Sequence, residues 1–161
     1  MNGVMELEFW MRVAIGEAEE SLREGNKGFG AVIIKDGEMV AAAHDYEETE
    51  GDATSHAEIN AIKIASQKIG KNLNGCILIS TSEPCPMCAF AIAWSGISEI
   101  AFGFSGGGEL HFSASRLLIR RAQRLLFIKV FCGGNAQFSI VLTFAAKLII
   151  CATQPMKTLR R

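Results

Sequence analysis

The chain has 161 residues, of which 49% are hydrophobic and 20% are charged, and it contains only three prolines. This length corresponds to one domain with a sizeable core, and the composition excludes a disordered chain and a disulfide-stabilised miniprotein. The five cysteines are odd in number and unevenly spaced, and acids stand near the N-terminus where a secretory signal would be basic. We therefore expect one folded unit in the reducing cytoplasm.

The net charge of -1 conceals a strong asymmetry along the chain. Residues 1–104 carry 7 Lys or Arg against 16 Asp or Glu, whereas residues 105–161 carry 9 against a single acid, so the two parts have net charges of -9 and +8. The most apolar stretch, residues 138–152, contains Lys147 and is shorter than the roughly 20 apolar residues that span a bilayer. We interpret this stretch as core and expect no membrane partner.

The first elements are predicted from hydrophobic spacing and turn residues. Apolar residues at helical spacing followed by Gly25 indicate an amphipathic helix, and two apolar runs around an Asp-Gly pair are typical of a β-hairpin. Five acids within eight residues then indicate an exposed loop. This loop leads directly to His56 and the start of a second helix, so we expect it to lie near the entrance of any site that contains His56. The predicted ranges are a helix over 7–22, strands over 29–34 and 39–43, the loop over 45–52 and a helix over 57–68.

The next elements alternate between strand and helix. Residues 76–81 form a continuous β-branched run typical of a buried strand, and Pro86 suits the first turn of the helix that follows. That helix is predicted to extend to Trp94 and to stop at Gly96, after which residues 97–104 resume strand character. This order predicts one mixed sheet covered by helices, a three-layer α/β domain.

Two short segments carry the residues best suited to chemistry, Ser55-His56-Ala57-Glu58 and Pro84-Cys85-Pro86-Met87-Cys88. Cys85 and Cys88 are three residues apart, so one helical turn brings both sulfurs to one side, where they and His56 can bind zinc. Two thiolates cancel the charge of the ion and leave a fourth position for water, which is typical of a catalytic site. Both segments stand at predicted helix starts, whose free N–H groups favour anions. Glu58 is then placed to act as proton carrier.

Other interpretations of the two cysteines are a redox pair or half of a structural zinc site. Such a structural site would need further ligands from elsewhere in the chain. The candidates for these ligands are His44, Cys76, Cys132 and Cys151.

The combination of His-x-Glu with Pro-Cys-x-x-Cys is a signature of the zinc nucleobase deaminases. Residues 5–105 resemble the cytidine deaminase-like superfamily, on the branch of cytosine, guanine and tRNA adenosine deaminases. The resemblance implies the cytidine deaminase-like fold, one zinc per chain, a homodimer, and hydrolytic release of ammonia from a nucleobase or nucleoside. It also implies that Glu58 passes a proton from zinc-bound water to a ring nitrogen. The segment that begins Phe29-Gly30-Ala31 and the aromatic Trp94 look most like guanine deaminases, in which an aromatic near that last position lies against the base. This resemblance implies that Phe29 and Trp94 contact the substrate.

Asp45 stands eleven residues before His56, where the family usually has a substrate-binding asparagine. An ionised carboxylate only accepts hydrogen bonds, so Asp45 favours a ring N–H or a ribose hydroxyl. The acidity of residues 1–104 favours a small neutral base or nucleoside, because nucleic-acid affinity comes largely from Lys and Arg.

Two other functions remain open at this point. One is a tRNA-specific adenosine deaminase that holds tRNA with its basic C-terminal segment, and the other is a catalytically inactive binding subunit with the same fold. The basic residues of that segment are Arg116, Arg120, Arg121, Arg124 and Lys129.

Beyond residue 104 the resemblance stops and acids almost disappear. We expect residues 1–104 to form the zinc deaminase core and residues 105–161 to be an atypical basic segment that completes the same domain or is appended to it. A native segment would pack as a helix over 114–123, a strand over 125–131 and a final helix. A reading-frame change in the coding DNA would produce the same shift in composition.

Overall fold

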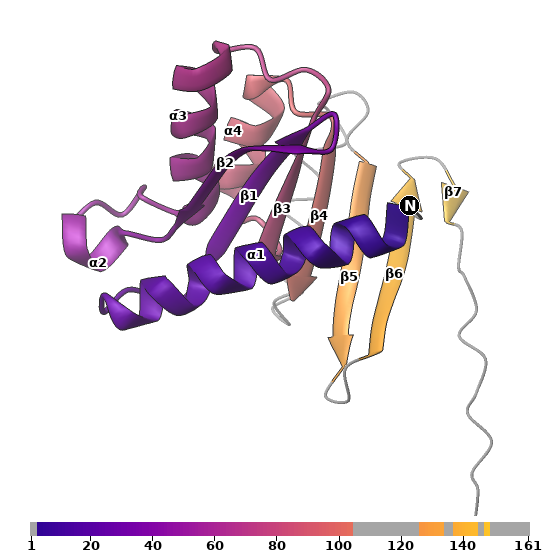
Figure 1. Cartoon of the computed structure of the whole chain (residues 1–161). Helices are drawn as coiled ribbons and strands as arrows, with labels where there is room; N and C mark the ends of the chain where they lie inside the picture. The colour runs from indigo at the N-terminus through magenta and orange to yellow at the C-terminus, as the bar shows by residue number, and fades with distance from the viewer. Residues whose placement is uncertain (1–2, 105–125, 134–136, 145–146, 149–161) are drawn as a thin grey trace, which may run out of the picture.

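The computed structural model describes residues 3–104, 126–133, 137–144 and 147–148. Its strands form one mixed sheet in the order β2-β1-β3-β4-β5-β6-β7 (Figure 1). Strand β1 pairs antiparallel with β2 and β3, the pairs β3–β4 and β4–β5 are parallel, and the pairs β5–β6 and β6–β7 are antiparallel. The elements are α1 (Gly3–Arg23), β1 (Gly30–Lys35), β2 (Glu38–His44), α2 (Glu47–Glu50), α3 (Ala57–Ile69), β3 (Cys76–Ser82), α4 (Pro86–Ser95), β4 (Glu99–Phe104), β5 (Leu126–Gly133), β6 (Gln137–Phe144) and β7 (Lys147–Leu148).

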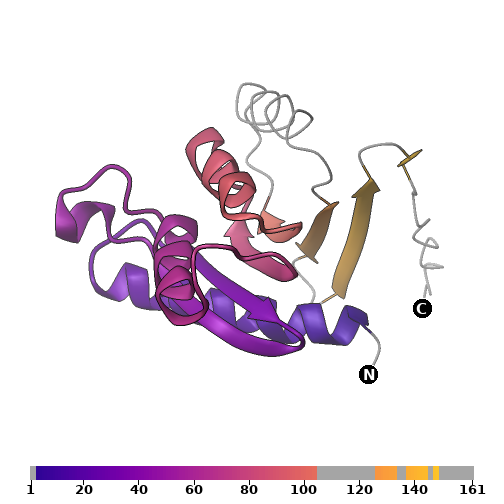
Figure 2. The ribbon, with the colours of Figure 1, turned by 90° about the horizontal axis from the view of Figure 1, so that it is seen from above.

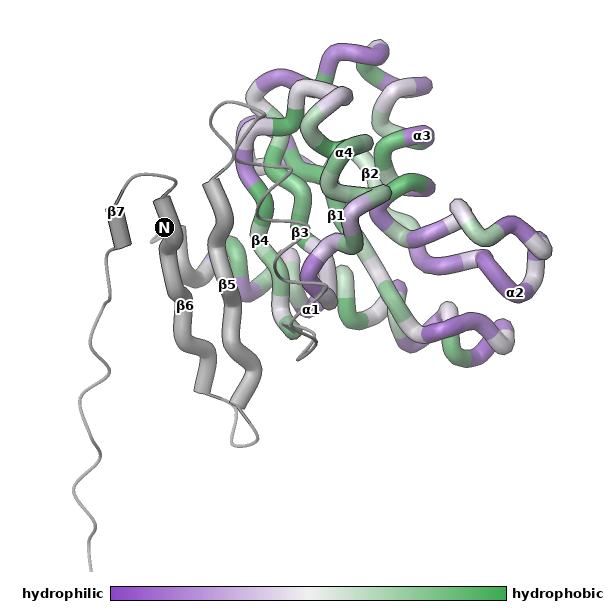
Figure 3. The backbone as a smooth tube through the Cα atoms, turned by 180° about the vertical axis from the view of Figure 1, so that it is seen from behind, coloured by the Kyte–Doolittle hydropathy of each residue, from purple (hydrophilic) through white to green (hydrophobic). Residues whose placement is uncertain are grey.

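Helices cover both faces of this sheet. Helix α1 lies on one face and α3 and α4 lie on the other (Figure 2). Met11 and Ala14 of α1 pack against Val32, Ile79 and Ala101. The central strands β1, β3 and β4 are hydrophobic along most of their length, whereas the segment around α2 is hydrophilic (Figure 3). The predicted three-layer α/β domain with a mixed sheet is therefore confirmed.

The start of β1 is fixed by a close approach of α1. A Cβ atom at Gly30 would lie 2.0 Å from the backbone oxygen of Ala14, so only glycine allows the helix to cross the strand at this point. The N–H of Gly30 donates to Oγ1 of Thr81 at 3.1 Å, which ties the same residue to β3. These contacts hold the preceding Phe29 at one end of the sheet.

Four strand ends meet at that end of the sheet. The register pairs Gly30 at the start of β1 with His44 at the end of β2, and it pairs Ser82 with Phe104 at the ends of β3 and β4. Because β1 is antiparallel to β3, the start of one lies beside the end of the other. Helices α3 and α4 begin after connections that leave this same end, so their N-termini gather here.

Most predicted elements are confirmed, including the hairpin at Asp36 and Gly37, both of which have positive φ. Two expectations are corrected. The acidic loop over 45–52 contains the short helix α2, and Asp45 is buried rather than exposed. The expected final helix is wrong for the part of the C-terminal segment that the structure describes, because β6 and β7 are strands.

The strand conformation of β6 follows from its aromatic and β-branched residues, which pair antiparallel with those of β5. The strand expected over 125–131 is confirmed as β5. The helix expected over 114–123 lies outside the described residues. Across the described part of the chain, no helix combines the length and apolar character needed to cross a bilayer.

A buried histidine connects α1 to the end of β2. Nδ1 of His44 lies 2.9 Å from Glu17 and Nε2 lies 3.0 Å from Glu24, so each ring nitrogen faces a carboxylate. Both nitrogens can donate only when the ring is protonated. Burial alone would lower the pKa of His44, but the hydrogen bonds to Glu17 and Glu24 outweigh it and raise the pKa above its ordinary value. This geometry favours the protonated ring, which lies between the two carboxylates.

The raised pKa gives His44 a predicted pH dependence. Its contribution to stability is fully present below the ordinary histidine pKa of about 6.5 and is lost as the pH rises through the higher folded value. Near pH 6 we expect the substitution His44→Gln to lower the free energy of unfolding by about 1.5–3 kcal/mol, the usual contribution of hydrogen bonds to a charged group. Urea unfolding of both proteins from about pH 6 to pH 9 should show this difference shrinking. A difference that stays constant with pH would contradict the ion-pair interpretation.

Candidate active site

Three soft ligand side chains meet at the N-termini of α3 and α4. His56 is the N-cap of α3, Cys85 is the N-cap of α4, and Cys88 lies in the first turn of α4. Nδ1 of His56 is 3.6 Å from Sγ of Cys85 and 3.5 Å from Sγ of Cys88. The three ligand atoms all lie within 4.8 Å of one another. The structure thus brings together the three residues predicted to bind a metal.

The chemistry of this donor set fits zinc. One imidazole nitrogen and two sulfurs match the ligands of a catalytic zinc site that keeps its fourth position for water or substrate. A hydrogen bond from the Cys88 thiol lowers the pKa of Cys85 to about 5, and the backbone N–H groups of Met87 and Cys88 act in the same direction. The shared proton conversely raises the pKa of Cys88. A cation that replaces this proton would be held by two thiolates.

Glu58 lies beside this cluster on the first turn of α3. Its side chain is buried, with 6% of the residue exposed, and burial raises the pKa of its carboxyl group. The hydroxyl of Ser80 on β3 donates to Oε1 of Glu58 at 3.1 Å and fixes its orientation. The structure therefore places an oriented carboxyl group next to the three ligands.

A cavity of about 340 Å³ opens in front of the cluster. This volume lies at the lower end of the range of about 300–1,000 Å³ for small-molecule sites. The walls combine two aromatic rings with an unusual number of carboxylates. The lining residues are Lys27, Phe29, Asp45, Glu47, His56, Glu58, Ser82, Glu83, Cys85 and Phe104.

Asp45 is held rigidly at the wall of this cavity and is only 1% exposed. Its backbone N–H donates to the carbonyl of Phe29 at 3.0 Å, and its own carbonyl accepts a hydrogen bond from Oγ of Ser21 at 3.1 Å. Its Oδ1 accepts the backbone N–H of Glu47 at 3.2 Å. The carboxylate that was expected to bind substrate therefore also orders the start of α2.

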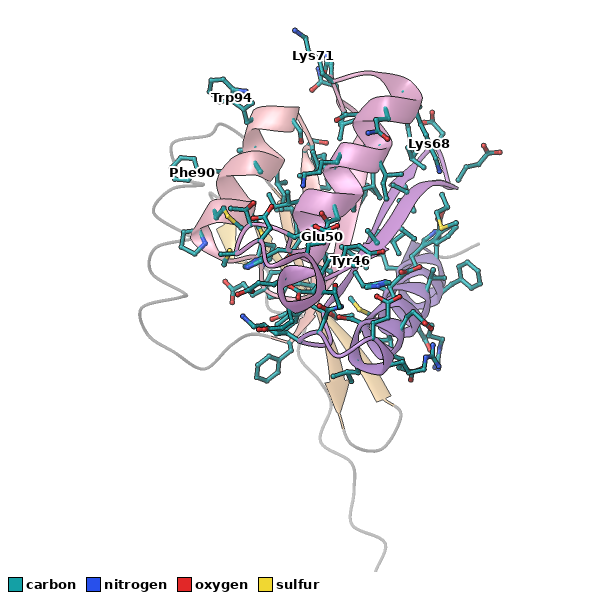
Figure 4. The ribbon with its side chains drawn as sticks, turned by 90° about the vertical axis from the view of Figure 1, so that its left-hand side faces the viewer. Tyr46, Glu50, Lys68, Lys71, Phe90 and Trp94 are labelled. Atoms are coloured by element: carbon teal, nitrogen blue, oxygen red, sulfur yellow. The ribbon has the colours of Figure 1, made fainter. Side chains whose placement is uncertain are left out.

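Of the three residues predicted to contact substrate, the structure places Asp45 and Phe29 in the cavity wall but not Trp94. Trp94 is 94% exposed and extends outward from α4 (Figure 4). It follows Cys88 by six residues, a rotation of about 240° around the helix, so the two side chains leave α4 in different directions. Two alternative ligands for a structural zinc site are also separate, because His44 faces Glu17 and Glu24 and Cys76 lies buried outside the cluster. Cys151 lies outside the described residues.

Sequence reasoning missed Lys27, Glu47, Ser80 and Phe104. Phe104 had a usable signal, since it ends a strand parallel to the one that precedes Cys85. Glu47 had only a weak signal, because it is one of five acids in a segment that was interpreted as a solvated loop. Lys27 and Ser80 carry no local pattern that distinguishes them from surface or core residues.

Comparison with known proteins agrees with this geometry. A family model of the cytidine and deoxycytidylate deaminase zinc-binding region matches residues 5–104. The chain belongs to this family. It is 41% identical over 96 residues to a tRNA-specific adenosine deaminase of Aquifex aeolicus and 42% identical over 93 residues to a guanine deaminase of Bacillus subtilis.

These alignments cover 59% and 56% of this chain, and the chain spans 64% and 60% of the length of those two relatives. A solved structure of guanine deaminase from Bacillus subtilis superposes with a TM-score of 0.57 at 35% identity, covering 66% of this chain and 67% of that one. The predicted cytidine deaminase-like fold is confirmed by these similarities.

The ligand assignment predicts the effect of single cysteine substitutions on metal content. Purified protein should contain about one zinc per chain, as expected for a three-ligand catalytic site. Cys85→Ser and Cys88→Ser should each remove the zinc, because a hydroxyl is a poor ligand for this ion. Cys76→Ala is the matched control, since Cys76 lies buried at the start of β3 and outside the cluster. Elemental analysis measures the outcome, and equal zinc loss from all three variants would contradict the assignment.

Proposed function

We propose that this protein is a zinc-dependent hydrolytic deaminase that replaces an amino group of a nucleobase or nucleoside by a carbonyl oxygen and releases ammonia. The observation that carries the proposal is the buried carboxyl group of Glu58 beside His56, Cys85 and Cys88 at the cavity. A structural zinc site is closed by four protein ligands and needs no proton carrier. A carboxyl group next to three ligands and an open cavity is what hydrolysis requires.

His56 Nδ1, Cys85 Sγ and Cys88 Sγ would hold the ion. When bound, zinc lowers the pKa of a coordinated water to about 7 and so supplies a nucleophile at neutral pH. Glu58 would carry one proton from the attacking water to the ring nitrogen and the other to the departing amino group. The new C–O bond replaces the C–N bond, one water proton ends on the ring nitrogen, and the other ends on the ammonia that leaves. Ser80 keeps the Glu58 carboxyl group oriented during these transfers.

The charge of the cavity favours a small neutral substrate. Four carboxylate residues line the cavity, and the ammonium group of Lys27 is already paired with Glu47 at 2.6 Å. A phosphate group would therefore meet more repulsion than attraction. The rings of Phe29 and Phe104 provide apolar surfaces for the faces of a base. A free base or nucleoside of the guanine, cytosine or adenine type fits these conditions.

A tRNA-specific adenosine deaminase is the second candidate, and the 41% identity to a relative of that name supports it. This function would require the basic residues after position 104 to neutralise the RNA backbone. Steep loss of substrate affinity with increasing salt would favour tRNA over a free base. A binding subunit without activity is the third candidate and would bind zinc but release no ammonia.

Ammonia release from a panel of bases, nucleosides and tRNA tests the proposal directly. We expect activity with at least one base or nucleoside from zinc-loaded protein. Glu58→Gln should retain zinc and fold but lose at least about 10²-fold in turnover, the lower end of the contribution of a general acid/base. Turnover within a few-fold of the parent would contradict the role of Glu58, and absence of ammonia from every substrate would support the binding subunit.

Asp45 is proposed to accept a hydrogen bond from a donor on the substrate. Asp45→Asn adds a donor at the same place, so we expect the ranking of substrates in the same panel to change while zinc content stays constant. Glu48→Gln is the matched control, because it removes a nearby carboxylate that is not part of the cavity wall. An unchanged ranking would leave Asp45 with its role in ordering α2 alone.

We also propose a homodimer in the cytoplasm. Phe90 and Trp94 are 54% and 94% exposed and lie one helical turn apart on α4, where both extend from the same helix (Figure 4). Exposed aromatic pairs of this kind favour contact with a partner surface. Sedimentation equilibrium should give the mass of two chains, and a monomer at all concentrations would contradict the dimer.

Finally, we propose that residues 1–104 are the catalytic core and that the basic residues 105–161 complete the same domain. The parallel pairing of β5 with β4, which joins Glu99 to Leu126, supports this division.

A further inference from the structure

Glu47 lies between a lysine and the histidine of the proposed metal site. Its Oε1 is 2.6 Å from Nζ of Lys27, and its Oε2 is 3.6 Å from Nε2 of His56. Glu47 is the first residue of α2, and its backbone N–H is held by Oδ1 of Asp45. The two oxygens of one carboxylate therefore face two different groups, and its backbone is fixed by the cavity wall.

The orientation of the His56 ring determines which of its nitrogens can bind a cation and which one faces Glu47. Nδ1 points to the two sulfurs, so a cation held there takes the lone pair of Nδ1 and the ring proton must sit on Nε2. Nε2 is the atom that faces Glu47. A carboxylate behind a ligating histidine fixes the tautomer and raises the basicity of the ligand.

Lys27 contacts the other oxygen of Glu47 and no ligand of the proposed metal site. The ammonium group of Lys27 lies 2.6 Å from Oε1 of Glu47 and so holds this carboxylate in place. Glu48 lies farther away, 3.9 Å from Nζ of Lys27, and its side chain is 59% exposed. Exposed ion pairs of that kind contribute little to stability. The contacts of Glu47 differ because one of them reaches a candidate ligand.

We propose that Glu47 is a positioning residue for His56, that Lys27 acts only through Glu47, and that together they strengthen zinc binding. The inference rests on the proposed zinc site. It goes beyond that site because it assigns a role to two residues outside the ligand set and outside the proton-carrying step. Removal of such a carboxylate typically costs 10–100-fold in metal affinity.

Zinc affinity measured by competition with a chromogenic chelator tests the inference without any assay of activity. For Glu47→Gln we expect the zinc Kd to rise about 10–100-fold. The matched control Glu48→Gln, which removes the same charge one residue later, should stay within a few-fold of the parent. Circular dichroism before zinc addition verifies that each variant is folded.

Substitution of Lys27 distinguishes a role in positioning Glu47 from a direct electrostatic effect of the ammonium group on zinc binding. If Lys27 acts by holding Glu47, Lys27→Met should weaken zinc binding in the parent and have no further effect in Glu47→Gln. Repulsion between an ammonium group and a metal ion predicts the opposite sign, tighter binding after Lys27→Met in both backgrounds. NMR of zinc-loaded protein provides a second readout, since the Nε2-bound proton of His56 should be protected in the parent and exchange faster in Glu47→Gln.

The possible results distinguish a failure of the positioning role of Glu47 from a failure of the proposed zinc site. A parent protein that binds no zinc overturns both. A parent that binds zinc, with Glu47→Gln indistinguishable from Glu48→Gln or with tighter binding after Lys27→Met, overturns the positioning role and leaves the zinc site intact. Weaker binding in Glu47→Gln together with non-additivity of the two substitutions supports the inference.

Discussion

Helices α3 and α4 both begin at the same end of the sheet, and each begins with a residue that can bind a soft cation. This convergence is the constraint on which the rest of the site depends. It follows from the sheet, because the parallel pair β3–β4 and the antiparallel hairpin β1–β2 place four strand ends together. Small residues keep the two helices close: Ala57, Ala61 and Ala89 lie in one buried cluster. Without that packing the sulfurs of α4 would not reach the histidine of α3.

The same convergence explains why so many carboxylates can share one cavity. Asp45 and Glu58 are buried, and an isolated buried carboxylate is costly unless it is hydrogen-bonded. Asp45 accepts a backbone N–H from Glu47, and Glu58 accepts the hydroxyl of Ser80. Two helix N-termini add positive potential to the region. The helix dipoles thus stabilise the anionic side chains, and these side chains in turn favour a cation. The acidity of the cavity is therefore an argument for zinc as well as against an anionic substrate.

The metal ligands could be predicted from the local sequence, whereas the positions of Glu47 and Trp94 could not, for physical reasons. The Cys-x-x-Cys spacing places both sulfurs on one side of a helix in any context, so the ligands were predictable. The contact of Glu47 with His56 was not predictable. Each of the five acids in its segment can face solvent equally well, and only the tertiary fold determines which of them faces the histidine. The orientation of Trp94 was unpredictable for a different reason. Helix α4 is apolar on all sides, with Phe90, Ile92 and Trp94 among its residues, so no polar face indicates which side is buried.

The prediction that residues 45–52 form an exposed loop was wrong because of contacts with α1 and the residue after it, which are distant in the sequence. Ser21 donates to the carbonyl of Asp45, and Glu17 and Glu24 hold the adjacent His44. These contacts pull the end of β2 against α1 and bury Asp45. Helix α1 supplies no ligand and no proton carrier, yet it fixes the backbone from which Asp45 and then Glu47 project. Asp45 accepts the backbone N–H of Glu47, and Glu47 in turn faces His56. These contacts connect the packing of α1 on one face of the sheet to the proposed metal ligands on the other face. A substitution in α1 that loosened these contacts would therefore be expected to act on the site without touching it.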